Sequence, residues 1–468
     1  MYNEKIEFKK DIPFSVKVQS ISRYSIHWHE NVIEIILPIR GSVEITSSFE
    51  HNIIQEGDFW FINNKYIHSI SSSNNAIIAI FHINLDYFEN QFEYIKYMTF
   101  RSNVYSENQR EKNGYNLDCD IRIEYKKRFR NLLISILSDA INENILSKRL
   151  TEKYEHQLIY SMIYEFNWLQ FQRQSNKFIS QIQLDRYHRI IKFIDEHYVE
   201  KITLDDIVAK EFITKNYFSH FWKNLSSYSF QECISCQRVL KSEYLLLSNI
   251  NITSISEQCG FSDVKYYYRH FKKWFGCMPI EYRNKSFSYI QRGFYYENLE
   301  FNNLEKVLKD YINNYFIALY GHNLDSDISF FVENYMKIKY LCTKDKNLAP
   351  SSSNHILINL FDHCNFHLEE TNFMFNWNSI DLLVNLSLDF GVSLYFRLNC
   401  DSIEKTLLYD VVNKFIDNCI FRYSIKTVNK WYFFINFRNM SLYKEAHDIK
   451  KMLDKKIKNA KVSYSFEF

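Results

Sequence analysis

A short helix pair that occurs twice, about 49 residues apart, constrains the fold of this chain more than any other feature. In the first copy, Thr203 and Asp206 have the spacing of a capping box, which predicts the start of a helix. After a turn over residues 210–213, Thr214 is a good N-cap for a second helix that carries aromatic side chains. Two helices joined by so short a turn cross each other, so the second can protrude into a major groove. The pattern therefore predicts a helix–turn–helix unit.

The second copy has the same boundaries. Thr253 can cap a helix that ends at Gly260, because glycine readily adopts the left-handed conformation that closes a helix. Ser262 can cap the helix that follows. A helical pattern over residues 230–247, without glycine or proline, joins the two copies. We therefore expect two helix–turn–helix units on one connecting helix.

Charge supports DNA binding locally. The whole chain has a formal net charge of only +2, which does not by itself indicate a nucleic-acid binder. Within residues 260–288, however, there are 6 lysines and arginines against 2 acidic residues. A solvated helix face would explain a lone basic helix, but the tandem units favour a DNA-binding surface.

Composition excludes several other classes. The chain has 8 glycines and 4 prolines and contains neither GxGxxG nor GxxxxGK[ST], so no phosphate-binding loop is expected. Its 9 cysteines are an odd, scattered set rather than a disulfide framework. Cys233 and Cys236 lack a second ligand pair for zinc, so they fit a helical face better. With no long apolar stretch or leader-like start, we expect a soluble, cytoplasmic, nucleoid-associated protein without membrane contact.

Periodicity divides the chain into four parts. Apolar runs at 32–39, 43–45, 59–62 and 77–83, separated by turn signals that include 71–75, predict an all-β region. Helical spacing dominates from 121 to 172, and strands alternate with helices after about residue 300, which indicates an α/β domain. The expected domains are a sensor at 1–110, a helical dimerisation and linker region at 111–180, an all-α DNA-binding domain at 181–288 and an α/β domain at 295–468.

The stretch 193–283 resembles the DNA-binding domain of the AraC/XylS family of bacterial transcription regulators. The most specific parts are GFSD at 260–263, RHFKKWFG at 269–276, PIEYR at 279–283 and the helix QRVLKSEYLLL at 237–247. Two departures are Trp222, where phenylalanine is usual, and His220, where an arginine is often present. The resemblance implies two recognition helices in successive major grooves, about 34 Å apart.

The resemblance also assigns candidate contacts. It implies base-facing positions in the first unit at Asn216, Ser219 and His220, and in the second unit at Val264, Lys265, Tyr266, Tyr268 and Arg269. The lysines expected on phosphates are Lys215, Lys223, Lys272 and Lys273.

The N-terminal region resembles a cupin barrel. The residues that carry this likeness are His27, His29, Glu34 and Gly41 in one motif, and Gly57 and His68 in the other. Asn63 and Lys65 stand where the second motif usually has proline and glycine. Two imidazoles, a carboxylate and a third imidazole could hold a divalent metal ion, which would make the region a metal cupin. Because AraC-type sensors commonly keep these residues without metal, we expect an effector pocket or a vestigial pocket, and no metal.

The C-terminal part resembles pieces of the β-xylosidase-like barrel of family 39 glycoside hydrolases. The likeness rests on WNSIDLLVNLSLDFGVSLYFRL at 377–398 and VNKWYFFINFRN at 428–439. Asn436 is kept, but Phe437 stands where the acid/base glutamate should follow, and a complete barrel needs roughly 250 residues. We therefore expect a truncated, degenerate TIM-barrel-like domain without hydrolysis, an unrelated α/β interaction domain being the alternative.

Together these features predict a sequence-specific transcriptional regulator that needs no cofactor. The resemblance implies an activator that binds promoter DNA as a homodimer, contacts RNA polymerase and responds to a small-molecule effector through the cupin. One alternative is a repressor or silencing antagonist of the same family. Another is an enzyme, either a metal cupin or a glycosidase, fused to a DNA-binding domain.

Overall fold

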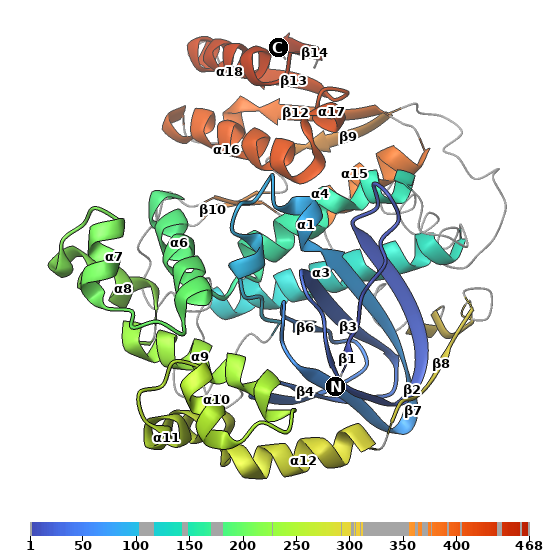
Figure 1. The fold of residues 1–468 in the computed structure, drawn as a ribbon. Helices are drawn as coiled ribbons and strands as arrows, with labels where there is room; N and C mark the ends of the chain where they lie inside the picture. Colours follow the sequence, from blue (N-terminus) through green and yellow to red (C-terminus); the bar gives the residue numbers. More distant parts are fainter. Residues whose placement is uncertain are drawn as a thin grey trace. The chain divides into compact units, whose positions relative to one another are not determined.

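The computed structural model (Figure 1) describes residues 2–102, 117–142, 148–169, 181–226, 228–291, 293–300, 304, 306–308, 310–311, 355–360, 364–366, 373–375, 377–390, 393–402, 405–437, 442–458 and 461–466. The chain forms two compact units. Unit 1 comprises Met1–Lys126, Asn144–Leu146 and Ser161–Tyr311, and unit 2 comprises Lys127–Glu143, Ser147–Tyr160 and Ile312–Phe468. Among the described residues no helix is long and apolar enough to span a membrane.

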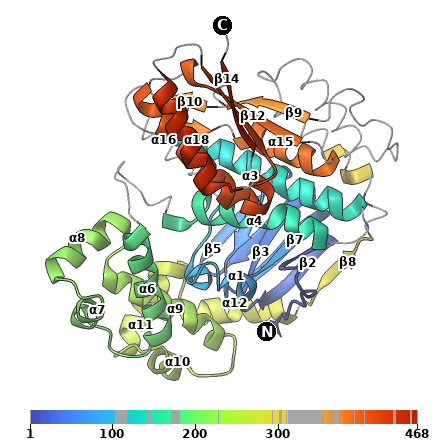
Figure 2. The same cartoon turned by 90° about the horizontal axis from the view of Figure 1, so that it is seen from above.

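An eight-stranded, mainly antiparallel sheet occupies the N-terminal part of unit 1 (Figure 2). Four of its strands correspond to the predicted apolar runs, and each has one or both faces buried. The central order is β1-β2-β7-β3-β6; β4 pairs with β5 and β7, and β8 pairs with β2. The strands are β1 (Tyr2–Asn3), β2 (Phe14–Trp28), β3 (Val32–Arg40), β4 (Val43–Ser47), β5 (Glu50–Ile54), β6 (Trp60–Ile62), β7 (His68–Asn84) and β8 (Tyr295–Asn298).

The turn predicted at 71–75 is wrong, because β7 runs through it without a break. Its polar residues stay in the sheet: Ser71 pairs with Arg23 of β2 and with Glu44 of β4. The register between β2 and β7 shifts next to Arg23, and Asn75 takes a left-handed φ of 51°. A bulge therefore bends the strand where the sequence suggested a reversal.

The remaining helices of unit 1 lie mostly in the reader, the name used here for residues 181–291. They are α6 (Gln181–His197), α7 (Leu204–Lys210), α8 (Lys215–Leu225), α9 (Phe230–Leu246), α10 (Ile252–Gln258), α11 (Val264–Phe275) and α12 (Pro279–Gln291). Before the reader come α1 (Leu85–Phe88) and the 3-10 helix η1 (Ile95–Tyr97).

The predicted helix pair between sheet and reader is present as α3 (Leu117–Asn142) and α4 (Lys148–Glu165). Both helices are divided between the two units. Their expected role in dimerisation stays a prediction, and residues 170–180, at the end of the predicted dimerisation and linker region, lie outside the described residues.

Unit 2 has the predicted α/β alternation. Its four parallel strands have the order β14-β13-β12-β9, and α16 packs beside α18 (Figure 2). A β-xylosidase-like barrel stays a prediction. The elements are β9 (His355–Asn359), β10 (Cys364–Phe366), β11 (Phe373–Phe375), α15 (Trp377–Phe390), β12 (Ser393–Asn399), η6 (Cys400–Ser402), α16 (Lys405–Tyr423), α17 (Ile425–Val428), β13 (Tyr432–Phe437), α18 (Tyr443–Lys456) and β14 (Lys461–Phe466).

A buried ion pair lies in unit 2. The Arg422 guanidinium donates to both carboxylate oxygens of Asp381, at 2.7 and 2.6 Å, and the Tyr423 hydroxyl donates to the same carboxylate. Arg422 is 1% exposed, and its guanidinium lies 5.0 Å from the centre of the Trp377 ring. Two-pronged pairing of this kind is the usual way in which an arginine is accommodated inside a protein.

Candidate DNA-binding surface and buried histidine cluster

The first helix–turn–helix unit begins as the sequence predicts. The Thr203 hydroxyl accepts from the Asp206 backbone and the Asp206 carboxylate from the Thr203 backbone, which is a complete capping box at the start of α7. The Thr214 side chain caps α8. Phe218 and Trp222 of α8 are buried in a core shared with α6, α7 and α9, so the opposite face of α8 points to solvent.

The second unit is built in the same way, but its caps lie one or two residues from the predicted ones. Asn251, not Thr253, caps α10, and Asp263, not Ser262, caps α11. Each of these residues has an extended backbone and accepts from a backbone N–H within the first turn, as an N-cap requires. Gly260 has the predicted left-handed φ, at 78°.

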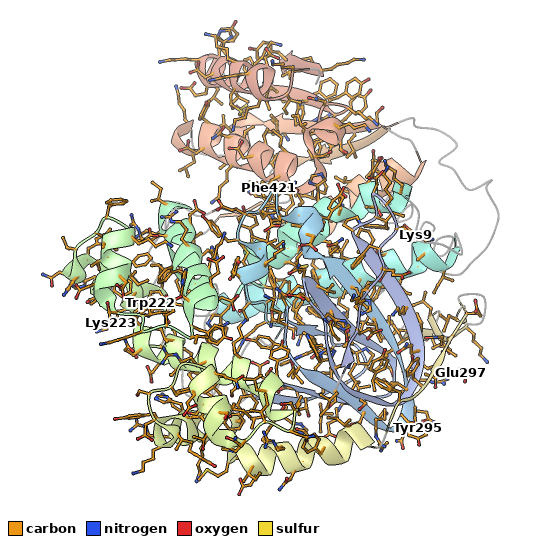
Figure 3. The ribbon with its side chains drawn as sticks, in the orientation of Figure 1. Lys9, Trp222, Lys223, Tyr295, Glu297 and Phe421 are labelled. Carbon is orange, nitrogen blue, oxygen red and sulfur yellow. The ribbon has the colours of Figure 1, made fainter. Side chains whose placement is uncertain are left out.

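Both recognition helices present the predicted contact residues to solvent. Ten of the twelve side chains are exposed, and two are half-buried. Figure 3 shows Lys223 on the outer side of α8 and Trp222 toward the interior. The exposed set is Lys215, Asn216, Ser219, His220, Lys223, Lys265, Tyr266, Arg269, Lys272 and Lys273, and the half-buried pair is Val264 and Tyr268.

Two of these lysines have acidic neighbours that the sequence motif does not reveal. Lys215 Nζ lies 2.6 Å from Asp205, and Lys273 forms an ion pair with Glu232 of α9. The Lys273 ammonium is the main reason that the pKa of Glu232 falls to about 2, so that carboxylate stays ionised. Phosphate binding by Lys273 therefore competes with an existing ion pair.

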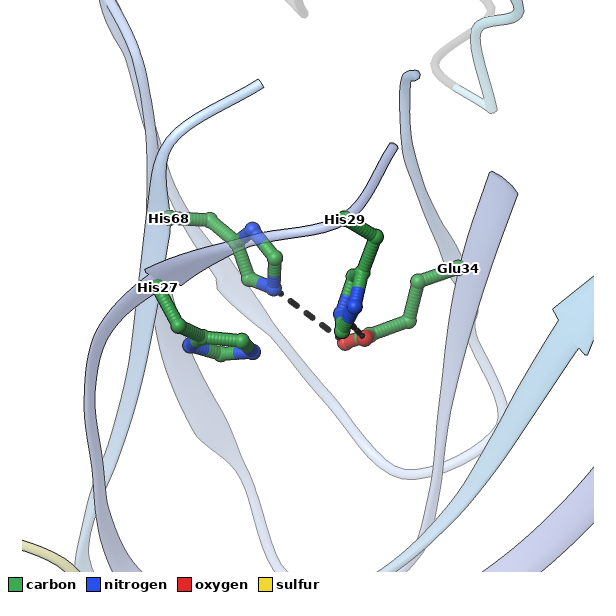
Figure 4. Close-up of side chains that lie close together, drawn as sticks. All are labelled: His27, His29, Glu34 and His68. Atoms are coloured by element: carbon green, nitrogen blue, oxygen red, sulfur yellow. Dashed lines mark hydrogen bonds and ion pairs between the residues drawn. The ribbon is translucent and has the colours of Figure 1, made fainter. Parts of the chain in front are cut away.

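A second group of residues gathers inside the N-terminal sheet (Figure 4). The ligand-type atoms of His27, His29, Glu34 and His68 all lie within 4.8 Å of one another, and all four residues are buried. His29 Nε2 lies 2.6 Å from Glu34 Oε2, and His68 Nε2 lies 3.5 Å from Glu34 Oε1. The structure thus brings together all four residues of the predicted effector pocket, here called the histidine cluster.

The other ring nitrogen of each cluster histidine is held by the backbone. Nδ1 of His27, His29 and His68 lies 2.8 to 3.1 Å from the backbone oxygens of Ser25, Glu4 and Tyr66, respectively. A carbonyl oxygen only accepts hydrogen bonds, so each Nδ1 carries a proton and each Nε2 faces the cluster. Burial lowers the pKa of His29, but the hydrogen bond that its Nε2 donates to the Glu34 carboxylate outweighs this and raises it. Metal-binding histidines are oriented in the same way.

His82 is a fifth member that sequence reasoning missed. It faces Glu34 across the β3–β7 pair, with Nε2 3.2 Å from Glu34 Oε2. Burial alone would raise the pKa of Glu34, but His68, His29 and His82 together hold it well below its ordinary value. The only sequence signal for His82 was its place on an inward-facing strand position.

The donor set of the cluster fits a divalent transition-metal ion. His68 Nε2 and Glu34 Oε1 are buried and have no hydrogen-bond partner among the described residues. Three imidazoles and a carboxylate suit zinc, iron, manganese or nickel. The sequence-based expectation of no metal stays a prediction, and the four residues could hold such an ion.

A cavity of about 280 Å³ lies elsewhere in unit 1, against the first reader helix. Its walls include Tyr94, Met98 and Ile163, together with Leu184 and His188 of α6. Burial lowers the pKa of His188 to about 4, so its imidazole is uncharged at neutral pH. The cavity is a more suitable space for a small organic molecule than the closely packed histidine cluster.

Three Asp and Glu residues near the C-terminal motif lie in helices. Asp410 and Asp417 lie in α16 and Glu445 lies in α18, where its carboxylate is 3.0 Å from Lys405. Phe437 is buried at the end of β13. Phe437, which stands where the sequence resemblance would place an acid/base glutamate, has no proton to donate.

Comparisons with known proteins agree with the motif. Residues 207–285 match the family described as "Helix-turn-helix domain". The chain is 24% identical over 274 residues to the HTH-type transcriptional regulator YdeC of Bacillus subtilis, covering 57% of this chain and 88% of that protein. It is 22% identical over 358 residues to an HTH-type transcriptional regulator of Staphylococcus aureus strain COL, covering 76% of this chain but only 42% of that protein.

A solved structure also aligns with the chain. Unsaturated fatty acid-bound ToxT from Vibrio cholerae covers 58% of this chain and 94% of its own, with 17% identity and a TM-score of 0.29. A score this low does not establish a shared arrangement of the aligned parts.

Proposed function

We propose that this chain is a transcriptional regulator of the AraC type and that it places α8 and α11 in two successive major grooves of promoter DNA. The observation that carries this proposal is that both helix–turn–helix units pack against one connecting helix, α9. Phe230 and Ile234 of α9 pack in the core of the first unit, and Val239 and Leu246 pack in the core of the second. A single helix thus fixes the spacing of the two units.

The exposed side chains of the two recognition helices fall into two groups, those suited to contact DNA bases and those suited to contact DNA phosphates. Arg269 projects from α11, with its guanidinium 4.9 Å from the centre of the Tyr266 ring, which limits its rotation. An arginine pre-oriented in this way suits the two acceptors of guanine. Lys223 and Lys272 are exposed and form no ion pair within the described residues, so they are suited to phosphates.

The test is DNA binding by the full chain, with duplexes first enriched from random sequence. Arg269→Ala should cost about 1–3 kcal/mol on the enriched duplex and relax preference at one position. Lys272→Ala should weaken binding to every duplex and reduce the salt slope by about one unit. Lys9→Ala, an exposed lysine near the N-terminus, is the matched control. Equal losses for Arg269→Ala on enriched and random duplexes would contradict base reading.

We also propose that this chain is a transcriptional activator. In this proposal it acts as a homodimer beside RNA polymerase in the bacterial cytoplasm. The relatives named above are regulators, which supports a regulatory role but does not separate activation from repression. Transcription in vitro from a bound promoter separates the two, since an activator raises and a repressor lowers the yield. Sedimentation of the full chain measures its oligomeric state.

For the C-terminal domain we propose a regulatory or sugar-binding role without hydrolysis. Retaining hydrolysis needs two carboxyl groups about 5–5.5 Å apart, one of which protonates the leaving oxygen. Phe437 occupies the acid position of the motif and cannot do so. Turnover of an aryl-xyloside that disappears with one Asp or Glu substitution would contradict this proposal.

A further inference from the structure

The helix pair α3–α4 is built into the same compact unit as the α/β domain, the name used here for the described residues between 355 and 466. Unit 2 includes residues 127–143 and 147–160, which make up most of both helices. The two helices are joined to each other by the Tyr154 hydroxyl, which donates to the Asp139 carboxylate at 2.5 Å. The helix pair therefore packs as part of unit 2, although a linker between sheet and reader needs no partner domain.

Tyr160 of α4 contacts one face of α16 in the α/β domain. Its hydroxyl donates to the Asn418 side-chain oxygen at 3.2 Å, and its ring meets the Phe421 ring edge-on at 5.4 Å. The Arg422 guanidinium lies 5.1 Å from the centre of the same ring. Positions 418, 421 and 422 lie on one side of a helix, so a continuous surface of α16 holds this tyrosine.

Arg128 of α3 contacts the α/β domain at a second point. Its Nε lies 4.0 Å from Asp381 Oδ2, on the carboxylate that also pairs with Arg422. Together with the Tyr160 contacts, this makes a junction of charged, amide and hydroxyl groups around two aromatic rings. Polar junctions between domains resemble transient protein interfaces, because water can take over their hydrogen bonds when they open. The junction is therefore suited to docking that can be released.

Helix α3 is buried on all of its sides. Ten of the eleven residues from 128 to 138 are buried, and Arg130 is half-buried. Eleven residues make about three helical turns, so every direction around the helix axis is covered. Among the buried side chains are Leu133, Ile136 and Leu137. This stretch of α3 therefore has no free apolar face for a second chain, which the dimerisation expected of the pair would need.

We propose that the α/β domain occupies the surface of the helix pair that a second copy of this chain would use, so that the chain dimerises through α3 and α4 only when this domain is released. This inference rests on the homodimer proposed above and gives the C-terminal domain its regulatory role. Release exposes apolar side chains of α3, and contiguous apolar surface of this kind favours association. A second copy presents the same surface, and a two-fold axis pairs it with itself.

The first experiment weakens the junction in the full chain. Asn418→Ala combined with Phe421→Ser, here called the opened variant, removes two contacts of Tyr160 but leaves the Arg422–Asp381 pair in place. Both chains of a dimer must have released the domain. Each tenfold rise in the released fraction should therefore strengthen dimerisation about 100-fold, as measured by sedimentation. Hydrogen exchange of α16 amides checks that the domain stays folded.

The matched control for the opened variant is Tyr409→Ser. It removes an aromatic ring from the same helix, but this ring is 41% exposed and makes no contact with Tyr160 among those described above. Dimerisation of this variant should stay at the wild-type value.

The second experiment tests which surface pairs in the dimer. Tyr160→Glu is added to the opened variant, so that a dimer through the helix pair would bury two like charges against each other. Such charges are costly to bury, and the triple variant should return to a monomer. Tyr87→Glu on α1, which changes an exposed tyrosine outside the helix pair, is the control and should keep the dimer of the opened variant.

Three results would overturn the inference: an opened variant that stays folded but dimerises no better than wild type, an equal gain in Tyr409→Ser, or a dimer that survives Tyr160→Glu. Failure of the proposed homodimer looks different, because no variant would then dimerise at all. Failure of DNA reading would show as no specific DNA binding by any of these chains, whatever their oligomeric state.

Discussion

Phe212 and Gly260 occupy the same backbone position in the turns of the first and second helix–turn–helix units, respectively. Both follow the C-cap residue of the preceding helix, and both are left-handed, with φ of 54° and 78°. Glycine takes this conformation without strain, but a bulky side chain does not. The Phe212 side chain is 95% exposed, so little packing compensates for the strain.

We therefore expect Phe212→Gly to stabilise the reader. Relief of the left-handed strain outweighs the extra backbone entropy of glycine, and the net gain should be about 1 kcal/mol. Hydrogen exchange of α7 and α8 amides in the full chain measures it. Gly260→Ala is the reciprocal control, because a Cβ there would meet the Val199 backbone oxygen at 2.4 Å and should destabilise the second unit. No gain in protection for Phe212→Gly would contradict the strain argument.

These turns also show how far the sequence predicts structure. Capping residues were predictable where one candidate stands alone, as at Thr214. They were misplaced where two candidates stand close together, as with Asn251 and Thr253, because the backbone conformation decides which one caps. Periodicity predicted the longer helices and the more apolar strands of unit 2, namely β9, α15, β12, α16, β13 and α18. It missed the short elements β10, β11, η6 and α17, and also β14, whose sequence alternates with polar residues instead of forming a continuous apolar run.

The histidine cluster was only partly predictable. His27 and His68 belong to motifs with fixed spacing, but His82 joins through the register of β3 and β7. Contacts between segments far apart in the chain have no local sequence signal. The same holds for Tyr244 and Lys65, whose hydrogen bond connects the reader to the sheet.

Releasing Lys273 from its acidic partner should strengthen DNA binding. Glu232→Gln keeps a side chain that can complete the capping box at Ser229, but it removes the charge that pairs with Lys273. With one more lysine free for phosphate, the salt dependence of binding should steepen by about one unit. Glu297→Gln on β8 makes the same change in net charge and is the control. If both variants gain equally, the ion pair has no specific role.

Glu243 should make the stability of the reader depend on pH. Burial against the N-terminal sheet raises its pKa to about 8, although hydrogen bonds from Tyr282 and Ser48 oppose the rise. Between the ordinary value of 4.5 and 8, the folded chain holds a proton that the unfolded chain releases. The unfolding free energy should therefore fall as pH rises through this window, by about 1.4 kcal/mol per pH unit where the difference is complete.

Glu243→Gln isolates this effect, because the amide stays neutral at every pH. The variant should lose the fall in stability and should be more stable than the wild-type chain at pH 8. Hydrogen exchange of α9 amides between pH 5 and 8, corrected for intrinsic rates, measures the change. Glu257→Gln on the neighbouring α10 is an exposed control and should keep the wild-type profile. Identical profiles for wild type and Glu243→Gln would contradict the prediction.

The last prediction concerns Asp381, the buried partner of Arg422. Asp381→Asn removes the charge that compensates a guanidinium with only 1% exposure, and an uncompensated buried charge typically costs about 3–5 kcal/mol. Asp417→Asn breaks the exposed pair with Lys456 and should cost about 1 kcal/mol or less. Hydrogen exchange of α15 and α16 amides compares the two variants within one domain. Similar losses in both would show that burial of the Asp381–Arg422 pair does not set its contribution.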